Sequence, residues 1–252
     1  MAISYSSSAS GQFVGVSSTR DLSMTTNSGD TRLIAGIFAN GGSGFSATFN
    51  GDAMTAVTSH TNGSYTMYVF ERINPDIGAY ILTFNWSGNI NGCMVAASYQ
   101  GDNTSVAISN FAGASAATVN ITAITGWTVL LSGNHHTGAN SMTAGSGSTS
   151  RSISTPNADN DIAGIFDSNA QVQGATSMAS SASGSTYAGV IVTIPILISN
   201  SILDTVTVTD TQNGLIATTF IDTITATDSI SSPDWQTKAK TTPATWTTTP
   251  KS

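Results

Sequence analysis

The chain has 252 residues, and its seven basic and fourteen acidic residues give a net charge of −7. Only 8% of the residues are charged, against about 25% in an ordinary globular domain, so serine, threonine and amide side chains supply most of the polar surface. The basic residues are scattered, which excludes the clustered cations that bind nucleic-acid phosphates. The single cysteine, Cys93, excludes an intrachain disulfide.

The first hundred residues read as short β-strands. Weak strand patterns at Ile3–Ser6 and Phe13–Val16 precede a polar, turn-rich segment, and Leu33–Phe38 has the continuous apolar character of a buried strand. The first ten residues of the chain, Met1–Ser10, lack the basic and apolar regions of a secretory signal. We therefore expect a soluble product that stays in the compartment where it is made.

The central stretch, Gly44–Gly101, organises the predicted fold. Asn50-Gly51 lies between two alternating runs and favours a type I′ hairpin turn. The runs that follow are separated by further turn residues at Thr61–Gly63, Asn74–Asp76 and Gly88–Gly92. This spacing predicts an antiparallel sheet of short strands that fold back on one another.

Side-chain alternation assigns the faces of these strands. Tyr80, Leu82, Phe84 and Trp86 share one face of their strand because alternate residues of a strand point the same way. Cys93, Val95, Ala97 and Tyr99 do the same in the last run. The run Tyr65–Phe70 is apolar on both faces, as in a central strand covered above and below. A two-layer sandwich is the simplest arrangement that buries all of them.

The chain beyond Gly101 continues in the same way. Strand patterns appear at Ala117–Ala123, Trp127–Leu131 and Asp161–Phe166, whereas the glycine- and serine-rich stretch 133–150 reads as a long hairpin or surface loop. The last strand, Tyr187–Ile198, contains Pro195, which lacks an N–H group and belongs at a strand end or sheet edge. No segment shows helical periodicity. We predict an all-β chain, with a β-sandwich domain over residues 1–198.

Several of these segments together resemble a known family. They are Phe49-Asn50-Gly51 with Met54-Thr55, an aromatic strand closing at Asn74-Pro75, Leu82–Gly88, and Ala97–Tyr99 with Gly101. The series, about a quarter of the chain, is similar to the jelly-roll-like β-sandwich domain of structural proteins in tailed bacteriophages. The resemblance implies a virion component of the capsid surface or of the tail, and it transfers no catalytic residue.

Residues 199–252 differ in character and are predicted to form an extended, β-rich C-terminal arm. Asp204-Thr-Val-Thr-Val-Thr-Asp210 recurs as Asp222-Thr-Ile-Thr-Ala-Thr-Asp228, and each copy places its apolar residues on one face. Neither copy can bury that face alone, so we expect the arm to pack against another surface. Trp235 and Trp246, each followed five residues later by a lysine, are suited to anchoring the tail on a neighbouring subunit. The predicted subunit-interaction residues are Val206, Val208, Ile224, Trp235 and Trp246.

The chain offers two candidates for a metal site. His135-His136 would point to opposite faces of a strand, so a solvated loop pair is the preferred interpretation. Asp159-Asn160-Asp161 could offer oxygen ligands to Ca²⁺, but the EF-hand pattern is absent and Asp and Asn favour turns for local reasons. We therefore predict a turn at these residues, with Ca²⁺ at Asp159 and Asp161 as the alternative.

No pattern of catalytic residues stands out. Glu71, the only glutamate, is followed by Arg72, and a solvated ion pair at a strand end is the plainest interpretation of these two residues. Cys93 lies on an apolar strand face, where a small buried side chain is favoured over a reactive thiol. Trp86 and Trp127 lie in apolar strands and are expected in the core. No nucleophile motif or dinucleotide motif is present.

The sequence thus predicts a non-enzymatic structural component of a phage-like virion, either a capsid decoration protein or a tail protein. Its expected partners are other virion proteins and copies of itself, with no nucleic acid, membrane, metal or cofactor. Its expected location is the virion, after synthesis in the host cytoplasm. The alternative is a carbohydrate- or host-receptor-binding adhesin module that uses the segment 133–150.

Overall fold

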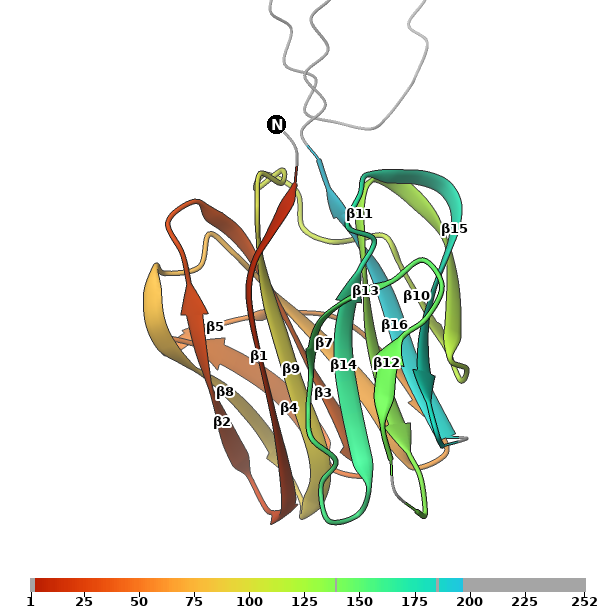
Figure 1. Cartoon of the computed structure of the whole chain (residues 1–252). Helices are drawn as coiled ribbons and strands as arrows, with labels where there is room; N and C mark the ends of the chain where they lie inside the picture. Colours follow the sequence, from red (N-terminus) through yellow and green to blue (C-terminus); the bar gives the residue numbers. More distant parts are fainter. Residues whose placement is uncertain (1–2, 139, 185, 197–252) are drawn as a thin grey trace, which may run out of the picture. The chain divides into compact units, whose positions relative to one another are not determined.

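The computed structural model describes residues 3–138, 140–184 and 186–196, which belong to one compact unit. These residues contain sixteen β-strands and no helix, in three antiparallel sheets that pack on one another (Figure 1). The predicted antiparallel β-sandwich fold is confirmed. The predicted arm, residues 199–252, lies outside the described residues.

The first half of the chain forms two facing sheets. Its inner sheet has the order β1-β9-β3-β7-β6, with bounds Ser4–Val16, Ile90–Gln100, Asp30–Asn40, Tyr65–Ile73 and Thr55–Asn62. Its outer sheet has the order β2-β8-β4-β5, with bounds Thr19–Thr26, Gly78–Ser87, Ser43–Phe49 and Asp52–Ala53. If β6 is left out and the remaining eight strands are renumbered 1 to 8 in chain order, the sheets have the orders 1-8-3-6 and 2-7-4-5. This is the jelly-roll topology. We call this half the first roll.

The second half repeats this topology. Its inner sheet has the order β10-β16-β11-β14-β13, with bounds Phe111–Ala114, Thr186–Pro195, Thr118–His135, Asp161–Asp167 and Thr149–Ile153. Outside it, β15 (Val172–Ala182) pairs with the first half of β11 and with β12 (Met142–Ala144). In this repeat, β10 takes the place of β1, β11 takes the places of both β2 and β3, and β12 takes the place of β4. The strands β13 to β16 then take the places of β6 to β9 in the same order. We call this half the second roll, and residues 101–110 the connector.

The long strand β11 serves both sheets of the second roll. Its residues 118–126 pair with β15, and its residues 126–135 pair with β14 and β16. The change of partner occurs at a register shift between Ala123 and Gly126. A Cβ atom on Gly126 would lie 2.0 Å from the carbonyl oxygen of Ile194, so the backbones approach too closely for any other residue.

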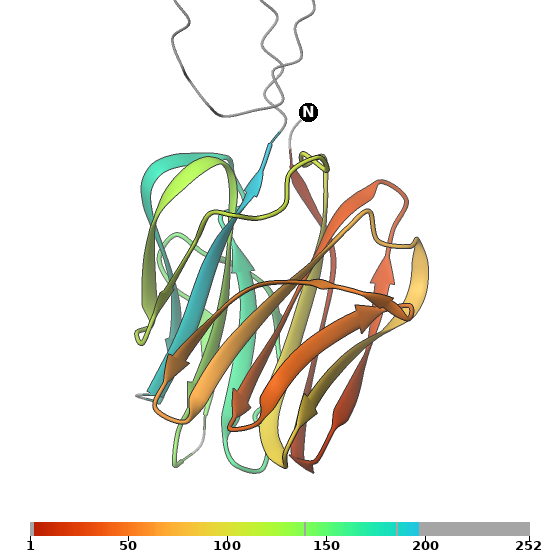
Figure 2. The same cartoon turned by 180° about the vertical axis from the view of Figure 1, so that it is seen from behind.

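The two rolls pack through their inner sheets (Figure 2). One core fills the first roll around Phe49 and Phe84, and another fills the second roll around Phe166. A third and larger core lies between the inner sheets, so three cores separate four layers. Strands β3 and β9 are therefore buried on both faces. The two-layer sandwich predicted from the central strands holds for the first roll, whereas the second roll packed on it was not predicted.

Contacts between the rolls are reciprocal. β14 packs on β9 as β16 packs on β7, and β13 lies beside β1 as β10 lies beside β6. The strand registers make Gly36 equivalent to Leu131 and Phe38 equivalent to Gly133. Each glycine faces its own large equivalent, since a Cβ on Gly36 would meet Leu131 at 2.4 Å and one on Gly133 would meet Phe38 at 2.0 Å. The rolls are thus related by a pseudo-twofold axis, like the subunits of an isologous dimer.

Most local sequence predictions hold. Asn50 and Gly51 have φ values of 52° and 83° and join β4 to β5, as a type I′ turn requires. Leu82, Phe84 and Trp86 are buried on one face of β8, and Trp127 is also in the core. Pro195 is the last residue of β16, so the sheet loses no internal hydrogen bond at this position.

Candidate functional site

The five predicted interaction residues, Val206, Val208, Ile224, Trp235 and Trp246, lie outside the described residues. The other candidates are the polar clusters in the rolls and the grooves on their surface.

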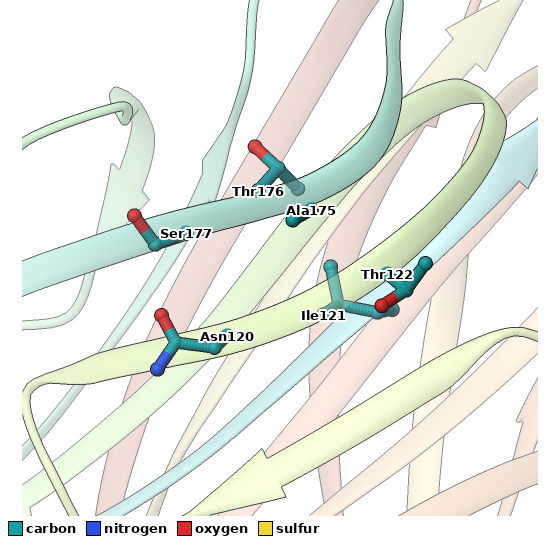
Figure 3. A pocket seen from close by; sticks show the side chains of 6 residues that line it. All are labelled: Asn120, Ile121, Thr122, Ala175, Thr176 and Ser177. Atoms are coloured by element: carbon teal, nitrogen blue, oxygen red, sulfur yellow. The ribbon is translucent and has the colours of Figure 1, made fainter.

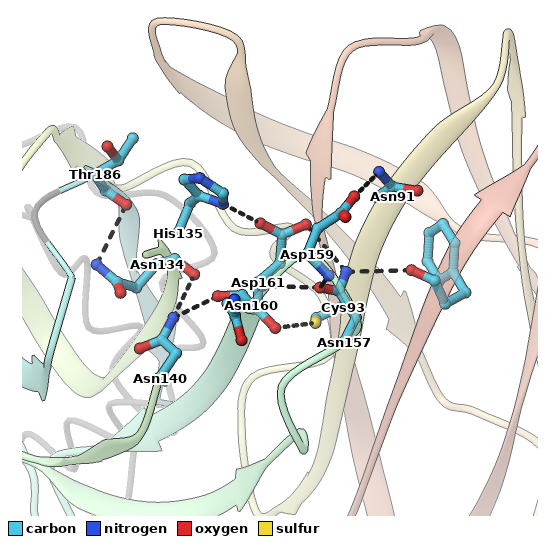
Figure 4. Close-up of polar contacts among 11 residues, drawn as sticks. Asn91, Cys93, Asn134, His135, Asn140, Asn157, Asp159, Asn160, Asp161 and Thr186 are labelled. Carbon is cyan, nitrogen blue, oxygen red and sulfur yellow. Dashed lines mark hydrogen bonds and ion pairs between the residues drawn. The ribbon is translucent and has the colours of Figure 1, made fainter. Parts of the chain in front are cut away.

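The turn predicted at Asp159–Asp161 is confirmed. Asn160 has a φ of 59°, and its N–H group donates to the carbonyl of Asn157 at 2.9 Å. The Asn157 side chain accepts hydrogen bonds from the N–H groups of Asp159 and Asp161 (Figure 4). These local bonds explain why Asx residues occupy the turn.

The carboxylates of this turn bind hydrogen-bond donors. Asp161 Oδ1 is 2.8 Å from His135 Nδ1, and Asp161 Oδ2 accepts from the amide of Asn157 at 3.0 Å. Asp159 accepts from the amide of Asn91. Among the residues that the structure describes, no group of three His, Cys, Asp or Glu side chains could hold a metal ion. The arrangement fits a structural turn rather than the Ca²⁺ alternative.

The prediction of a solvated His135-His136 loop pair was wrong for His135. This residue ends β11, and its ring stacks on Tyr65 of the first roll with centroids 4.6 Å apart. Burial, with Asp161 and Asp159 nearby, raises the pKa of Tyr65 to about 12. The contact joins the two rolls, which sequence reasoning could not see because Tyr65 and His135 are far apart in the chain.

The His135–Asp161 pair has the hydrogen bond of a catalytic dyad, but the neighbouring cysteine does not act with it. Cys93 is fully buried and donates its S–H to the main-chain oxygen of Asp161 at 3.2 Å. Burial raises the pKa of the Cys93 thiol to about 12, so it stays protonated at neutral pH and is a poor nucleophile. Burial also raises the pKa of Asp161, although hydrogen bonds from Asn157 and His135 oppose this shift. The cluster holds β9, β11 and β14 together.

The prediction of a solvated Glu71–Arg72 pair was also wrong. Glu71 is buried and pairs with Arg32, which is fully buried and also lies 2.5 Å from Asp102. Arg72 pairs instead with the exposed Asp52. The sequence held a signal for the buried network, because Glu71 directly follows the run Tyr65–Phe70, which is apolar on both faces.

The Arg32 network fixes the connector between the rolls. Arg32 Nη2 donates to the carbonyls of Val106 at 2.8 Å and Asn103 at 3.0 Å, and the N–H of Ile108 donates to Glu71 Oε1 at 2.9 Å. Every one of these bonds reaches from the first roll to the connector. Asp102 Oδ1 is buried and has no hydrogen-bond partner, but the other groups of the network are engaged structurally.

A second buried arginine network joins the rolls at one edge. Arg151 of β13 binds both oxygens of Asp167, at 2.6 and 2.8 Å, and its guanidinium lies 4.3 Å from the ring centroid of Tyr5 in β1. The hydroxyls of Ser8 and Ser10 donate to the carbonyls of Arg151 and Ile153. Strand edges that would otherwise be open to pairing are therefore covered by the partner roll.

The segment 133–150, predicted as a long hairpin or a surface loop, contains the end of β11, the whole of β12 and the start of β13. Gly133 lies inside β11, and Met142 in β12 is buried in the core. Asn140 is buried, and its amide donates to the carbonyls of Asn134 and Asn160. Its glycine and serine content misled the interpretation, because these residues here allow close packing.

Two of the grooves on the surface of the described residues are candidate binding sites. One, about 420 Å³, runs between β11 and β15, where the side chains of Asn120, Thr122 and Ser177 lie on the exposed face (Figure 3). The other, about 200 Å³, lies in the first roll beside the stacked rings of Phe45 and Tyr68. Neither is lined by a charged side chain.

Comparisons with known proteins add no assignment. No family model, no curated protein and no solved structure matches the chain. Within the described part of the chain, no helix is long and apolar enough to cross a membrane.

Proposed function

We propose that this chain is a non-enzymatic structural component of a phage-like virion that assembles through residues 199–252. The observation that carries the proposal is the contrast between the rolls and the arm. The polar clusters of the rolls are engaged in holding strands and connector together, and edge strand β13 is covered by β1. The arm sequence, in contrast, carries repeated apolar stripes and two tryptophans that need a surface to pack on.

The physical character of the rolls fits a particle component. Three cores and three sheets make a rigid body, and its few charges leave a surface of hydroxyl and amide groups suited to close contact with neighbours. Burying each large apolar side chain of the arm would stabilise attachment by about 1.5–3 kcal/mol. Its partners would be capsid or tail subunits and other copies of the chain.

The test is binding to particles by full-length variants. The double variant Trp235→Ala/Trp246→Ala should lose co-sedimentation with phage-like particles while keeping the circular-dichroism spectrum of the native chain. A matched control, Thr242→Ala/Thr248→Ala, alters the same tail without removing an anchor and should bind normally. Electron micrographs of bound particles would then assign the protein to the head or the tail. Undiminished binding by the tryptophan variant would refute attachment through the arm.

The second candidate is a carbohydrate- or host-receptor-binding module, and one observation favours it. The groove between β11 and β15 presents hydroxyl and amide groups from Asn120, Thr122 and Ser177, which can hydrogen-bond to sugar hydroxyls (Figure 3). No aromatic residue lines it, so the usual stacking surface for a sugar ring is missing there. A glycan array probed with the full chain tests this candidate, because the first proposal expects no binder.

A further inference from the structure

The second groove differs between the two rolls in a way that points to a docking site. In the first roll, Phe45 of β4 stacks on Tyr68 of β7 with centroids 4.1 Å apart, and both rings are only partly buried. In the second roll, the registers place Met142 and Gly164 at the equivalent positions. Met142 is buried there and packs against Gly164. The same position is thus closed in one roll and lined by partly buried aromatic rings in the other.

The lining of this groove suits an apolar side chain held in an extended segment. It consists of Phe45, Tyr68 and Phe70 with Ala56, Val57, Thr58, Ser59 and Val69, and none of these side chains is charged. The rings of Phe45 and Trp86, with centroids 6.1 Å apart, continue the aromatic surface into the core. Half-exposed aromatic rings beside a buried core are typical of interaction sites.

The charge distribution of the chain identifies a suitable occupant. Residues 3–196 contain four arginines and nine acidic residues, a net charge of −5, whereas residues 233–252 contain three lysines and one aspartate, a net charge of +2. All three lysines of the protein are in this last segment. Lys240 and Lys251 each follow a tryptophan of the tail by five residues, and Lys238 lies between Trp235 and Lys240. The segment therefore combines aromatic anchors with a charge opposite to that of the rolls.

The length of the arm allows it to reach another molecule. Trp235 follows Ile196 by 39 residues (235 − 196). At about 3.3 Å per residue, an extended chain of this length spans up to roughly 130 Å. This span is about twice the length of β11, whose 18 residues cover about 60 Å when fully extended. A tail attached to the end of the second roll can therefore occupy a groove on a separate copy.

We infer that the groove beside Phe45 and Tyr68 is the receptor for the tryptophan- and lysine-bearing tail, residues 233–252, of a second copy of this chain. This inference rests on the proposed function and names the partner surface of the arm. A tryptophan side chain packs on the two partly buried rings, and the neighbouring lysines lie along the acidic rolls.

Sedimentation velocity of the full chain over a concentration series tests the inference. Ala56→Lys places a positive charge on the exposed part of the groove lining without entering the core, and this charge also repels the lysines of the tail. It should weaken self-association at least tenfold. Ser46→Lys, which adds the same charge to the same strand as Phe45 but on its exposed outer face, should associate like the native chain. Equal association of native chain and Ala56→Lys variant would overturn the inference.

A disulfide experiment separates a neighbouring copy from the chain's own tail. In the double variant Ala56→Cys/Thr247→Cys, oxidation should give a ladder of covalent oligomers on a denaturing gel, whereas each single variant gives at most a dimer. An internally closed monomer would overturn the inference, because it places the tail on its own groove. A native chain that stays monomeric yet binds particles through Trp235 and Trp246 would also overturn it, while leaving the proposed function intact.

Discussion

The packing of Phe38 against Gly133 gives the sharpest test of the pseudo-twofold arrangement. Phe38 is fully buried, and a Cβ on Gly133 would lie only 2.0 Å from its ring. Gly133→Ala alone should destabilise the fold by about 2–3 kcal/mol, the upper range for overpacking. Phe38→Ala alone should cost about 3–5 kcal/mol, as for the loss of a buried aromatic side chain. Alanine removes the Cγ and Cδ2 atoms that the added methyl group would strike.

The double variant should therefore be less destabilised than the sum of the two single changes, with a favourable coupling of about 1–2 kcal/mol. Urea unfolding followed by circular dichroism measures the free energy of each variant, with an unchanged m-value as the control for a common unfolding transition. Gly189→Ala combined with Phe38→Ala is the matched control. Gly189 lies on the other face of the inner sheet, against Val119, so these two changes should add. Additivity within about 0.5 kcal/mol at Phe38 and Gly133 would refute the packing described for the two rolls.

Three further results are expected. Glu71→Gln should destabilise the protein by about 3 kcal/mol, because it removes one of the two buried carboxylates that pair with Arg32. Arg72→Ala at the exposed pair should cost under about 1 kcal/mol in the same urea titration, and equal costs would contradict the buried network. Cys93 should resist iodoacetamide at pH 8 until urea unfolds the chain, as mass spectrometry can follow, and rapid native labelling would contradict its burial. Gly174→Ala should cost about 1–2 kcal/mol through backbone strain alone, since Gly174 has a φ of 82° and a Cβ atom added there would meet open space. A melting temperature unchanged by this substitution would contradict that backbone conformation.

Local features of the fold could be predicted from the sequence because their causes are local. The Asn50-Gly51 turn follows from the positive φ angles that these two residues tolerate, and the buried face of β8 follows from alternation. The number of layers could not be predicted in this way. The pentapeptide Ile-Ala-Gly-Ile-Phe occurs at 34–38 and at 162–166. Ile34 and Phe38 face the core between the rolls, but Ile162 and Phe166 face the core of the second roll. Identical residues thus point opposite ways, since the surrounding strands decide which face each takes.

The candidate sites divide in the same manner. The turn at Asp159–Asp161 is a local structure and was predicted, whereas the partners of Arg32, Glu71 and His135 come from distant strands. The connector contacts of Arg32 carry no sequence motif, because they depend on the return of the chain to β3 after β9.

Comparing equivalent positions separates what the jelly-roll fold needs from what this chain adds to it. Glu71 and Asp167 are equivalent, and each is a buried acid paired with an arginine. The bulges at Ala56/Thr58 and Ser150/Ser152 also coincide, as do Gly78 and Gly174 with positive φ. These shared features serve the common backbone. Val57 and Arg151 occupy the same place in the two bulges, yet Arg151 holds Tyr5 of the other roll while Val57 lines the open groove. Closing both rolls does not require the partly buried rings of Phe45 and Tyr68 to line an open groove beside Val57, so this divergence supports the inference that the groove receives a partner.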